Sequence, residues 1–404
     1  MLQKTKSRLF IAALCVATLY PFYAAQGQPQ TLADLTQAAE TGAVSAQLQL
    51  AETYDRGLAV PQDFNLAAQW YAKAANQGNA AAQNRLGRYL RSGIGLESDN
   101  TKAFDWLSKA ANAGKPTFIY DLAQMYEQGI GVAQNFAKAA DLYTQASSAG
   151  HVEAAVSLGV LYQNGTGVAQ DFNKAYTLFF TQAQAGHPRA QNNLGLLYTR
   201  GQGVDQDYKE AADWYQRATN SGLTTAMTNL GVLYENGFGV KQSDGRAAEL
   251  YRRAGQHKDT SFQALIERIG FIGDPRLKLA NDTDSTLAAQ ETAAQRGDPV
   301  AQFLLGLIIV SQPHPKTNYT LAADLFSRAA KAGIPAARSN LGLLYFRGQG
   351  VPQDYATGYM WLSLAAANHQ PNLAAIRDSF TYLLTQDQIK EAQQMAAAYW
   401  TDSK

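Results

Sequence analysis

The stretch from Ala190 to Leu223, AQNNLGLLYTRGQGVDQDYKEAADWYQRATNSGL, decides the fold. Its first part predicts a helix, because apolar residues recur there at helical spacing, namely Ala190, Leu194, Leu197 and Tyr198. Gly201 and Gly203 then interrupt that helix, since glycine adopts positive φ at little cost. Asp207 is placed to cap a second helix, whose apolar stripe consists of Ala211, Trp214, Tyr215 and Ala218. The stretch therefore predicts two helices joined by a glycine-rich turn.

This unit recurs along the chain with a period of 36 residues. The register of Leu194 is shared by Leu50, Leu86, Leu122, Leu158 and Leu230, and after a gap it resumes at Leu305 and Leu341, again 36 apart. We call these the reference leucines. A hairpin of this size is too small to bury its own apolar stripe, so neighbouring copies must cover one another. The sequence therefore predicts an all-α solenoid of stacked helix-turn-helix repeats.

The register divides the chain into six segments. They are a signal peptide (1–27), a tail and capping helix (28–42), repeats one to six (43–256), a degenerate repeat (257–297), two further repeats (298–370) and C-terminal capping helices (371–404). The degenerate repeat is inferred because Leu230 and Leu305 are 75 residues apart, two periods plus three. Its helices are expected near 262–269 and 287–296. Thr385 and Gln388 predict a capping box for the last helix.

The consensus LGxLYxxGxGVxxDxxKAxxWxxKAAxxG resembles the Sel-one-like repeat, a relative of the tetratricopeptide repeat. Copies from Leu158 to Gly186 and from Leu194 to Gly222 fit that pattern closely. The resemblance covers roughly residue 32 to the C-terminus, and it implies a right-handed superhelical solenoid that serves as an adaptor or scaffold for other proteins. In bacteria such proteins are often exported and linked to envelope assembly or host contact.

The same resemblance leaves two alternative functions open. Periplasmic members can regulate a cell-wall enzyme, and cysteine-rich members have been associated with binding or cleaving β-lactams and cell-wall components. The family does not supply a general set of catalytic residues. This chain has one cysteine, Cys15, and lacks the cysteines of those members. We therefore expect a non-catalytic protein that binds protein partners or an extended peptide.

The first residues have the pattern of a secretory signal peptide. Lys4, Lys6 and Arg8 precede an apolar run over 9–20, and cleavage is expected after Gly27. The run is short for a transmembrane helix, although an uncleaved anchor is the alternative. Cleavage would change the formal charge from +1 to −2, because it removes three basic and no acidic residues. Neither charge indicates a nucleic-acid partner. The pattern predicts a periplasmic or secreted protein without a stable membrane span.

The sequence predicts no catalytic residues, no cofactor and no metal site. The Gly-x-Gly pairs lack a phosphate-binding lysine, and no Gly-x-Ser-x-Gly motif occurs. His151 and His187 are 36 residues apart and are interpreted as loop residues on one edge of the solenoid. As metal ligands they would need further donors about 2 Å from the ion. Carboxylates such as Asp55 and Glu127 are expected on a solvated face.

Two features are candidates for partner binding. The first is a polar column immediately before the reference leucines, formed by Arg85, Asp121, Asn193, Asn229 and Asn340. On stacked first helices these side chains would lie toward the concave side, where amides hydrogen-bond the backbone or carboxylate of an extended peptide. The alternative is that the amides bridge adjacent repeats.

The second feature is the unusually apolar seventh copy. Its residues exceed what the helical stripe needs, and the ones of interest are Phe303, Leu304 and, in the next copy, Phe346. They either pack in the core and against the capping helices or form an exposed patch for a partner.

Overall fold

The computed structural model describes residues 31–258, 265, 269–274, 276–277, 284–311, 318–381 and 383–403. Every regular element within these ranges is an α-helix, and the helices follow one another in stacked hairpins. The predicted all-α solenoid is therefore confirmed. The predicted signal peptide, most of the expected helix at 262–269 and most of the turn of the seventh copy lie outside the described residues.

The helices alternate between the first and the second helix of a repeat. The N-terminal capping helix is α1 (Leu32–Glu40). Repeats one to six are formed by α2 (Val44–Arg56) and α3 (Phe64–Asn76), α4 (Ala80–Ser92) and α5 (Asn100–Ala111), α6 (Pro116–Gln128) and α7 (Phe136–Ser148), α8 (Val152–Asn164) and α9 (Phe172–Gln184), α10 (Pro188–Arg200) and α11 (Tyr208–Asn220), α12 (Thr224–Asn236) and α13 (Asp244–Lys258). The C-terminal half contains α15 (Asp284–Gln295), α16 (Pro299–Ser311), α17 (Tyr319–Lys331), α18 (Pro335–Arg347), α19 (Tyr355–Ala366), α20 (Pro371–Thr381) and α21 (Gln386–Asp402).

The turn inside each repeat depends on two glycines with different tasks. In repeat three, Gly129 ends α6 in the left-handed conformation with φ of 68°. Gly131 lies against the preceding repeat, where an added Cβ would be 1.9 Å from the carbonyl oxygen of Asn100. Asn135 then caps α7, because its side chain accepts a hydrogen bond from the backbone N–H of Lys138. The turn thus sets both the hairpin angle and the distance to the preceding repeat.

The small residue after each reference leucine allows the two helices of a repeat to touch. A Cβ on Gly195 of α10 would lie 2.6 Å from the ring of Tyr215 on α11. Trp214, beside that ring in the sequence, is buried, as are Trp70 and Trp361 at the same register position. Close approach of the helices and burial of these large side chains together fill the core between them.

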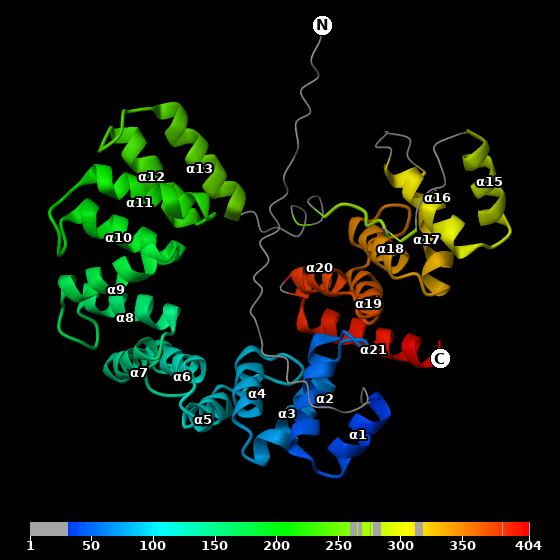
Figure 1. Ribbon diagram of the computed structural model, residues 1–404, viewed down its shortest axis with the longest axis horizontal. Coiled ribbons are helices and arrows are strands. Elements are labelled where there is room, and N and C mark those ends of the chain that lie inside the picture. The colour runs from blue at the N-terminus through cyan, green and yellow to red at the C-terminus, as the bar shows by residue number, and fades with distance from the viewer. Residues whose placement is uncertain are drawn as a thin grey trace, which may run out of the picture.

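The stack bends back on itself, so that its last helices lie beside its first (Figure 1). Helices α1 to α13 form a curved N-terminal arm, and α15 to α21 form the C-terminal half. In the arm, α4 and α6 lie on the inner side of the curve and α5 and α7 on the outer side (Figure 1). One hydrophobic core continues from the first repeats into the C-terminal half, and it includes Leu50, Tyr89, Phe346, Phe380 and Ala396.

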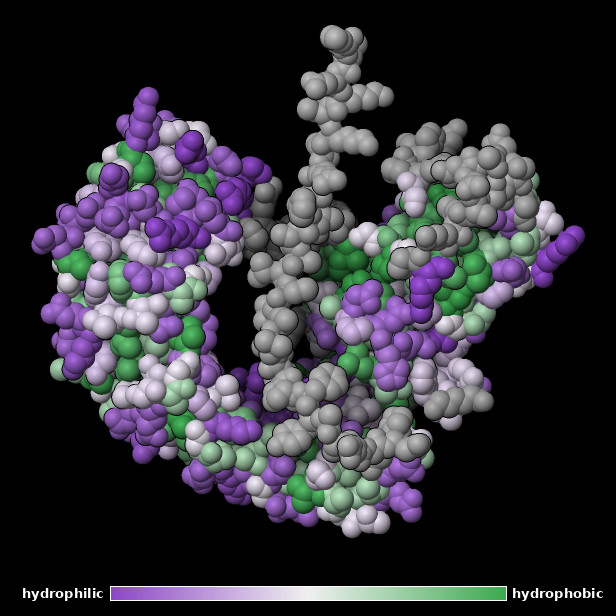
Figure 2. Space-filling model, in the orientation of Figure 1, coloured by the Kyte–Doolittle hydropathy of each residue, from purple (hydrophilic) through white to green (hydrophobic). Residues whose placement is uncertain are grey.

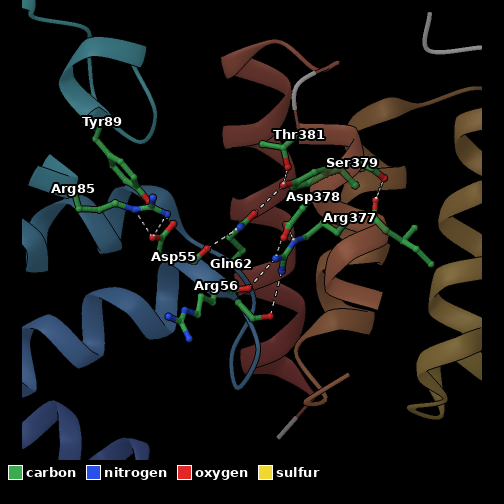
Figure 3. Close-up of polar contacts among 12 residues, drawn as sticks. Asp55, Arg56, Gln62, Arg85, Tyr89, Arg377, Asp378, Ser379 and Thr381 are labelled. Atoms are coloured by element: carbon green, nitrogen blue, oxygen red, sulfur yellow. Dashed lines mark hydrogen bonds and ion pairs between the residues drawn. The ribbon is translucent and has the colours of Figure 1, made fainter. Parts of the chain in front are cut away.

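Buried polar contacts join the two ends of the stack (Figure 3). Arg377 of α20 is 1% exposed, and its guanidinium donates hydrogen bonds to the carbonyl oxygens of Arg56 at 2.8 Å and Gly57 at 3.3 Å. These carbonyls lie at the C-terminal end of α2, where a helix leaves acceptors unpaired and a cation is favoured. The Tyr359 hydroxyl donates to Gln62 at 2.8 Å. The C-terminal helices therefore act as a cap on the first repeat.

Candidate partner-binding surface

The chain itself shows how an inner-face helix holds an extended segment. Residues 269–274 form no helix and pass across α18 (Figure 1). Asn340 of α18 donates its Nδ2 hydrogen to the carbonyl of Ile272 at 2.9 Å and accepts from the N–H of Ile272 at 2.7 Å. One amide side chain therefore satisfies both backbone groups of one residue, as an extended backbone allows.

A guanidinium and two apolar side chains complete this contact. Arg347 donates to the carbonyl of Ile269, and its Cζ lies 4.5 Å from the centroid of the Phe271 ring. That ring also stacks on Phe326 of α17, with centroids 6.4 Å apart. A Cβ on Gly273 would lie 3.8 Å from Leu307 of α16. We call Leu307, Phe326, Asn340 and Arg347 the α18 cradle.

The amides of the predicted polar column do two different things. Asn340 is fully buried and binds a backbone segment of the same chain. Asn229 instead donates to the side-chain oxygen of Asn192 at 2.9 Å, so it bridges α12 and α10. Asn193 accepts only a long hydrogen bond from Asn192, at 3.4 Å. Bridging of repeats, one of the two alternatives for the column, is therefore observed in the N-terminal arm, while at α18 the amide binds a backbone segment of the same chain. Binding of a partner's peptide stays a prediction.

The first members of the column stabilise the stack. Asp121 is buried and accepts a hydrogen bond from the amide of Asn84 in the preceding repeat at 2.8 Å. Arg85 forms an ion pair with Asp55, also in the preceding repeat, with Nη2 and Oδ2 2.6 Å apart. These two side chains are held by neighbouring repeats, so their structural role is explained without a partner.

The expectation that Asp55 lies on a solvated face is wrong. Its side chain is 7% exposed and accepts a hydrogen bond from the hydroxyl of Tyr71 at 2.9 Å. It also accepts from the hydroxyl of Tyr89 at 2.6 Å and from Arg85 (Figure 3). Burial and the nearby carboxylate raise the pKa of both tyrosines. Burial alone would lower the pKa of Arg85, but Asp55 more than offsets this and raises it. The cluster holds repeats one and two together.

The apolar residues of the seventh and eighth copies lie in the core. Phe303 is fully buried, and its ring centroid is 6.2 Å from that of Phe326. Leu304 is buried as well, and Phe346 stacks on Phe380 of the capping helix α20 with centroids 4.2 Å apart. Of the two alternatives for these residues, packing in the core and against the cap is the one observed. We place no partner contact on them.

Both histidines in the 36-residue register are helix N-caps. The Nδ1 of His151 accepts the backbone N–H of Ala154 at 3.2 Å, and His187 does the same for Ala190 at 3.3 Å. The Nε2 of His187 also lies 2.8 Å from a carboxylate oxygen of Glu153. No cluster of three or more metal-ligating side chains occurs among the described residues. Both histidines lie directly before the apolar stripe of a first helix in the sequence, and this position indicates a capping role.

Acidification is expected to weaken the cap at His151. Burial lowers the pKa of this ring below its ordinary 6.5, although Asp121 and Glu153 oppose the shift. The cap therefore contributes fully above the unfolded pKa, and its contribution is lost as the pH falls below that value. We expect the free energy of unfolding to drop by at most about 1 kcal/mol between about pH 7 and pH 5, since water screens the half-buried ring.

Guanidinium unfolding followed by circular dichroism at several pH values measures this effect. The variant His151→Asn retains a capping side chain but has no titrating ring, so its stability should change less over the same interval. An equal pH dependence in both proteins would contradict the assignment.

The N-terminal arm presents the register positions of the α18 cradle on its own first helices. Aliphatic side chains stand two residues after three reference leucines, and asparagines stand directly before two of them. We call this surface the inner-face strip, and its members are Val160, Asn193, Leu196, Arg200, Asn229 and Val232. Val232 is 41% exposed, and it shares this degree of exposure with Val152. The aliphatic members were missed in the sequence, although their recurrence at one register position beside the predicted amides was a signal.

The surface of the N-terminal arm is a mixture of hydrophobic and hydrophilic residues rather than uniformly apolar. In the view of Figure 2, hydrophobic residues of the N-terminal arm form separate patches between hydrophilic ones. Larger continuous hydrophobic areas lie on the C-terminal half (Figure 2). None of the described helices has the length and apolar character that crossing a membrane requires.

Comparison with known proteins identifies the repeat. The family model for the Sel1 repeat matches residues 44–79, 80–115, 117–151, 152–187, 188–223, 224–259, 299–334 and 335–369. A solved structure of c5321, described as a protective antigen of uropathogenic Escherichia coli strains with an SLR fold, is 25% identical with a TM-score of 0.50, over 92% of this chain and 88% of that one. A Sel1 repeat protein from Oxalobacter formigenes is 29% identical with a TM-score of 0.51, over 55% of this chain and 87% of that one. A comparison with curated proteins finds no match. With eight matched repeats over most of its length, the chain belongs to the Sel1 repeat family.

Proposed function

We propose that this chain is an exported, non-catalytic scaffold whose N-terminal arm binds protein partners along the inner-face strip. Sel1 repeats generally mediate protein interaction, and their fold is typically non-catalytic. The observation that carries the proposal is the binding of residues 269–274 by Asn340 and Arg347. A surface in the same register on the arm offers the same kinds of side chain to another chain.

The composition of the strip suits an extended peptide. Its aliphatic side chains recur from repeat to repeat, so they provide a narrow apolar track rather than a broad patch. Amides beside the track offer donors and acceptors for a peptide backbone, which would otherwise lose its hydrogen bonds to water. Weak contacts spread over several repeats add up to a specific interaction.

Export is supported by the N-terminal sequence and by one structural neighbour. Three basic residues followed by an apolar run match a secretory signal, and the E. coli neighbour is described as a protective antigen. The mature N-terminus is expected at residue 28. Edman sequencing or intact mass of the protein recovered from the periplasm or medium tests this directly, and an unprocessed N-terminus in the cytoplasm would contradict it.

The double variant Asn193→Ala/Asn229→Ala tests the binding role of the strip. Partners are first identified by crosslinking in the native envelope and mass spectrometry, and their affinity is then measured with purified proteins. We expect about tenfold weaker binding, because two amide contacts of roughly 0.5–1.5 kcal/mol each are lost.

A matched control removes two exposed amides at the ends of second helices, in Asn112→Ala/Asn220→Ala, and should leave the affinity within about twofold. Lower stability with unchanged partner affinity in Asn193→Ala/Asn229→Ala would mean that these amides only bridge repeats. The binding role would then be rejected.

A further inference from the structure

Two first helices of this chain are nearly identical along their inner edge. Residues 193–200 of α10 read NLGLLYTR, and residues 340–347 of α18 read NLGLLYFR. The single difference is Thr199 in place of Phe346. Because both segments are helical with the same bounds in their repeats, α10 presents Asn193 and Arg200 at the spacing at which α18 presents Asn340 and Arg347.

The helices before these two segments are also matched. Val160 of α8 takes the place of Leu307, and both side chains are half-buried. Phe179 of α9 takes the place of Phe326, and each ring packs so closely on the glycine of its own first helix that an added Cβ would lie 2.5 Å and 2.9 Å away, respectively. Valine therefore takes the place of leucine on the floor beneath α10, whereas Phe179 is already fully buried and offers no ring for a ligand to stack on.

The polar groups on α10 retain capacity to bind a ligand. Asn193 is half-buried, and the only hydrogen bond described for its side chain is the 3.4 Å contact with Asn192. Arg200 is exposed, and it forms no ion pair or side-chain hydrogen bond with the described residues. By contrast, Asn340 is fully buried by the segment that it binds. The α10 surface thus has the donors of the cradle without the segment.

We propose that Asn193 and Arg200 form a second cradle, which binds an extended peptide of another protein that carries an aromatic residue. This inference rests on the proposed function of the inner-face strip and specifies its ligand. Asn193 binds the N–H and carbonyl of one peptide residue, as Asn340 does for Ile272. The aromatic side chain directly before that residue lies against Arg200 and Val160, because Phe179 is already covered.

These contacts require two features of the ligand, an extended backbone and one aromatic side chain. Arg200 also donates to the carbonyl two residues before the aromatic residue, as Arg347 does for Ile269. Every polar contact is made to the peptide backbone, so the ligand needs an extended conformation and an aromatic residue but no charge. The chain's own segment 269–274 is held by the α18 cradle, and the same holds in any second copy. The occupant of the α10 cradle is therefore a different protein.

The probe is a fluorescein-labelled peptide with the sequence of residues 269–274, IGFIGD, titrated with the purified chain and followed by anisotropy. We expect saturable binding that weakens at least tenfold in Arg200→Ala and about fivefold in Asn193→Ala. The control variant Arg189→Ala, on the same helix but paired with Glu153, should bind like the wild type. A peptide with alanine in place of phenylalanine should bind at least tenfold more weakly.

Several results would overturn the inference. These are absence of binding, equal binding of the alanine peptide, or loss of binding in Arg347→Ala but not in Arg200→Ala, which would mean exchange into the α18 cradle. A concentration-dependent dimer that disappears in Phe271→Ala would make a second copy the occupant instead. If the peptide fails to bind while Asn193→Ala/Asn229→Ala still weakens a natural partner, only the aromatic ligand is rejected and the scaffold function stands.

Discussion

Replacing Asp55 with alanine is expected to lower the free energy of unfolding by about 3–5 kcal/mol. The carboxylate accepts hydrogen bonds from Tyr71, Tyr89 and Arg85, and it is the only group that the structure gives these two hydroxyls as an acceptor among the described residues. Arg85 is partly exposed and regains water, but each buried hydroxyl loses about 1–3 kcal/mol. Guanidinium unfolding followed by circular dichroism measures the change.

Glu52 provides a matched control for this substitution. It has the same charge and lies one turn earlier on α2, but it is not part of the hydrogen-bonded cluster. Glu52→Ala should change stability by less than about 0.5 kcal/mol. The variant Asp55→Asn retains one acceptor and should fall between the two. Similar stabilities for Asp55→Ala and Glu52→Ala would contradict the structural role assigned to the cluster.

Replacing Arg377 with alanine is expected to cost about 2–4 kcal/mol and to loosen the C-terminal cap from the first repeat. The guanidinium is buried at the C-terminal end of α2, and its loss leaves the carbonyls of Arg56 and Gly57 without their donor. Its neighbour Asp378 is half-exposed and returns to water at little cost. Chemical unfolding gives the stability change, and small-angle scattering should show a larger radius of gyration.

The control for this variant is Arg328→Ala. Arg328 forms an exposed ion pair with Asp324 within α17, which is worth less than about 0.5 kcal/mol. Its removal should leave both the stability and the radius of gyration unchanged. A radius of gyration that stays constant in Arg377→Ala would show that the apolar junction alone closes the stack.

The repeat and its caps were predictable because they depend on neighbours in the sequence. The reference leucines, the small residue after each and the turn glycines recur in one register, and the structure follows that register through α2 to α13 and α16 to α19. Asp207 caps α11 as predicted, with hydrogen bonds from two backbone N–H groups. Thr385 and Gln388 form the predicted capping box at α21.

The closure of the stack was not predictable, since it joins residues that no local period relates. Arg377 and Arg56 are 321 positions apart, and nothing in either repeat marks them as partners. The burial of Asp55 was missed for a different reason. Its tyrosine and arginine partners come from two different helices of adjacent repeats, and a carboxylate on a helix surface usually faces water.

The candidate surface was predicted in part. The amide column was visible because its members precede the reference leucines, and Asn340 does bind an extended backbone. Which amides bind a backbone and which bridge repeats depends on side-chain orientation, as the contact between Asn229 and Asn192 shows. The role of Arg347 could not be seen, because the segment that it binds lies outside the periodic part of the sequence.

Photo-crosslinking in intact cells tests whether partners bind the inner face of the N-terminal arm. A benzophenone amino acid replaces Val232 on the inner-face strip in one strain and Gln216, an exposed residue of the second helix α11, in another. We expect a discrete, ultraviolet-dependent adduct with a partner from position 232 and none from position 216. An adduct from position 216 alone would contradict it.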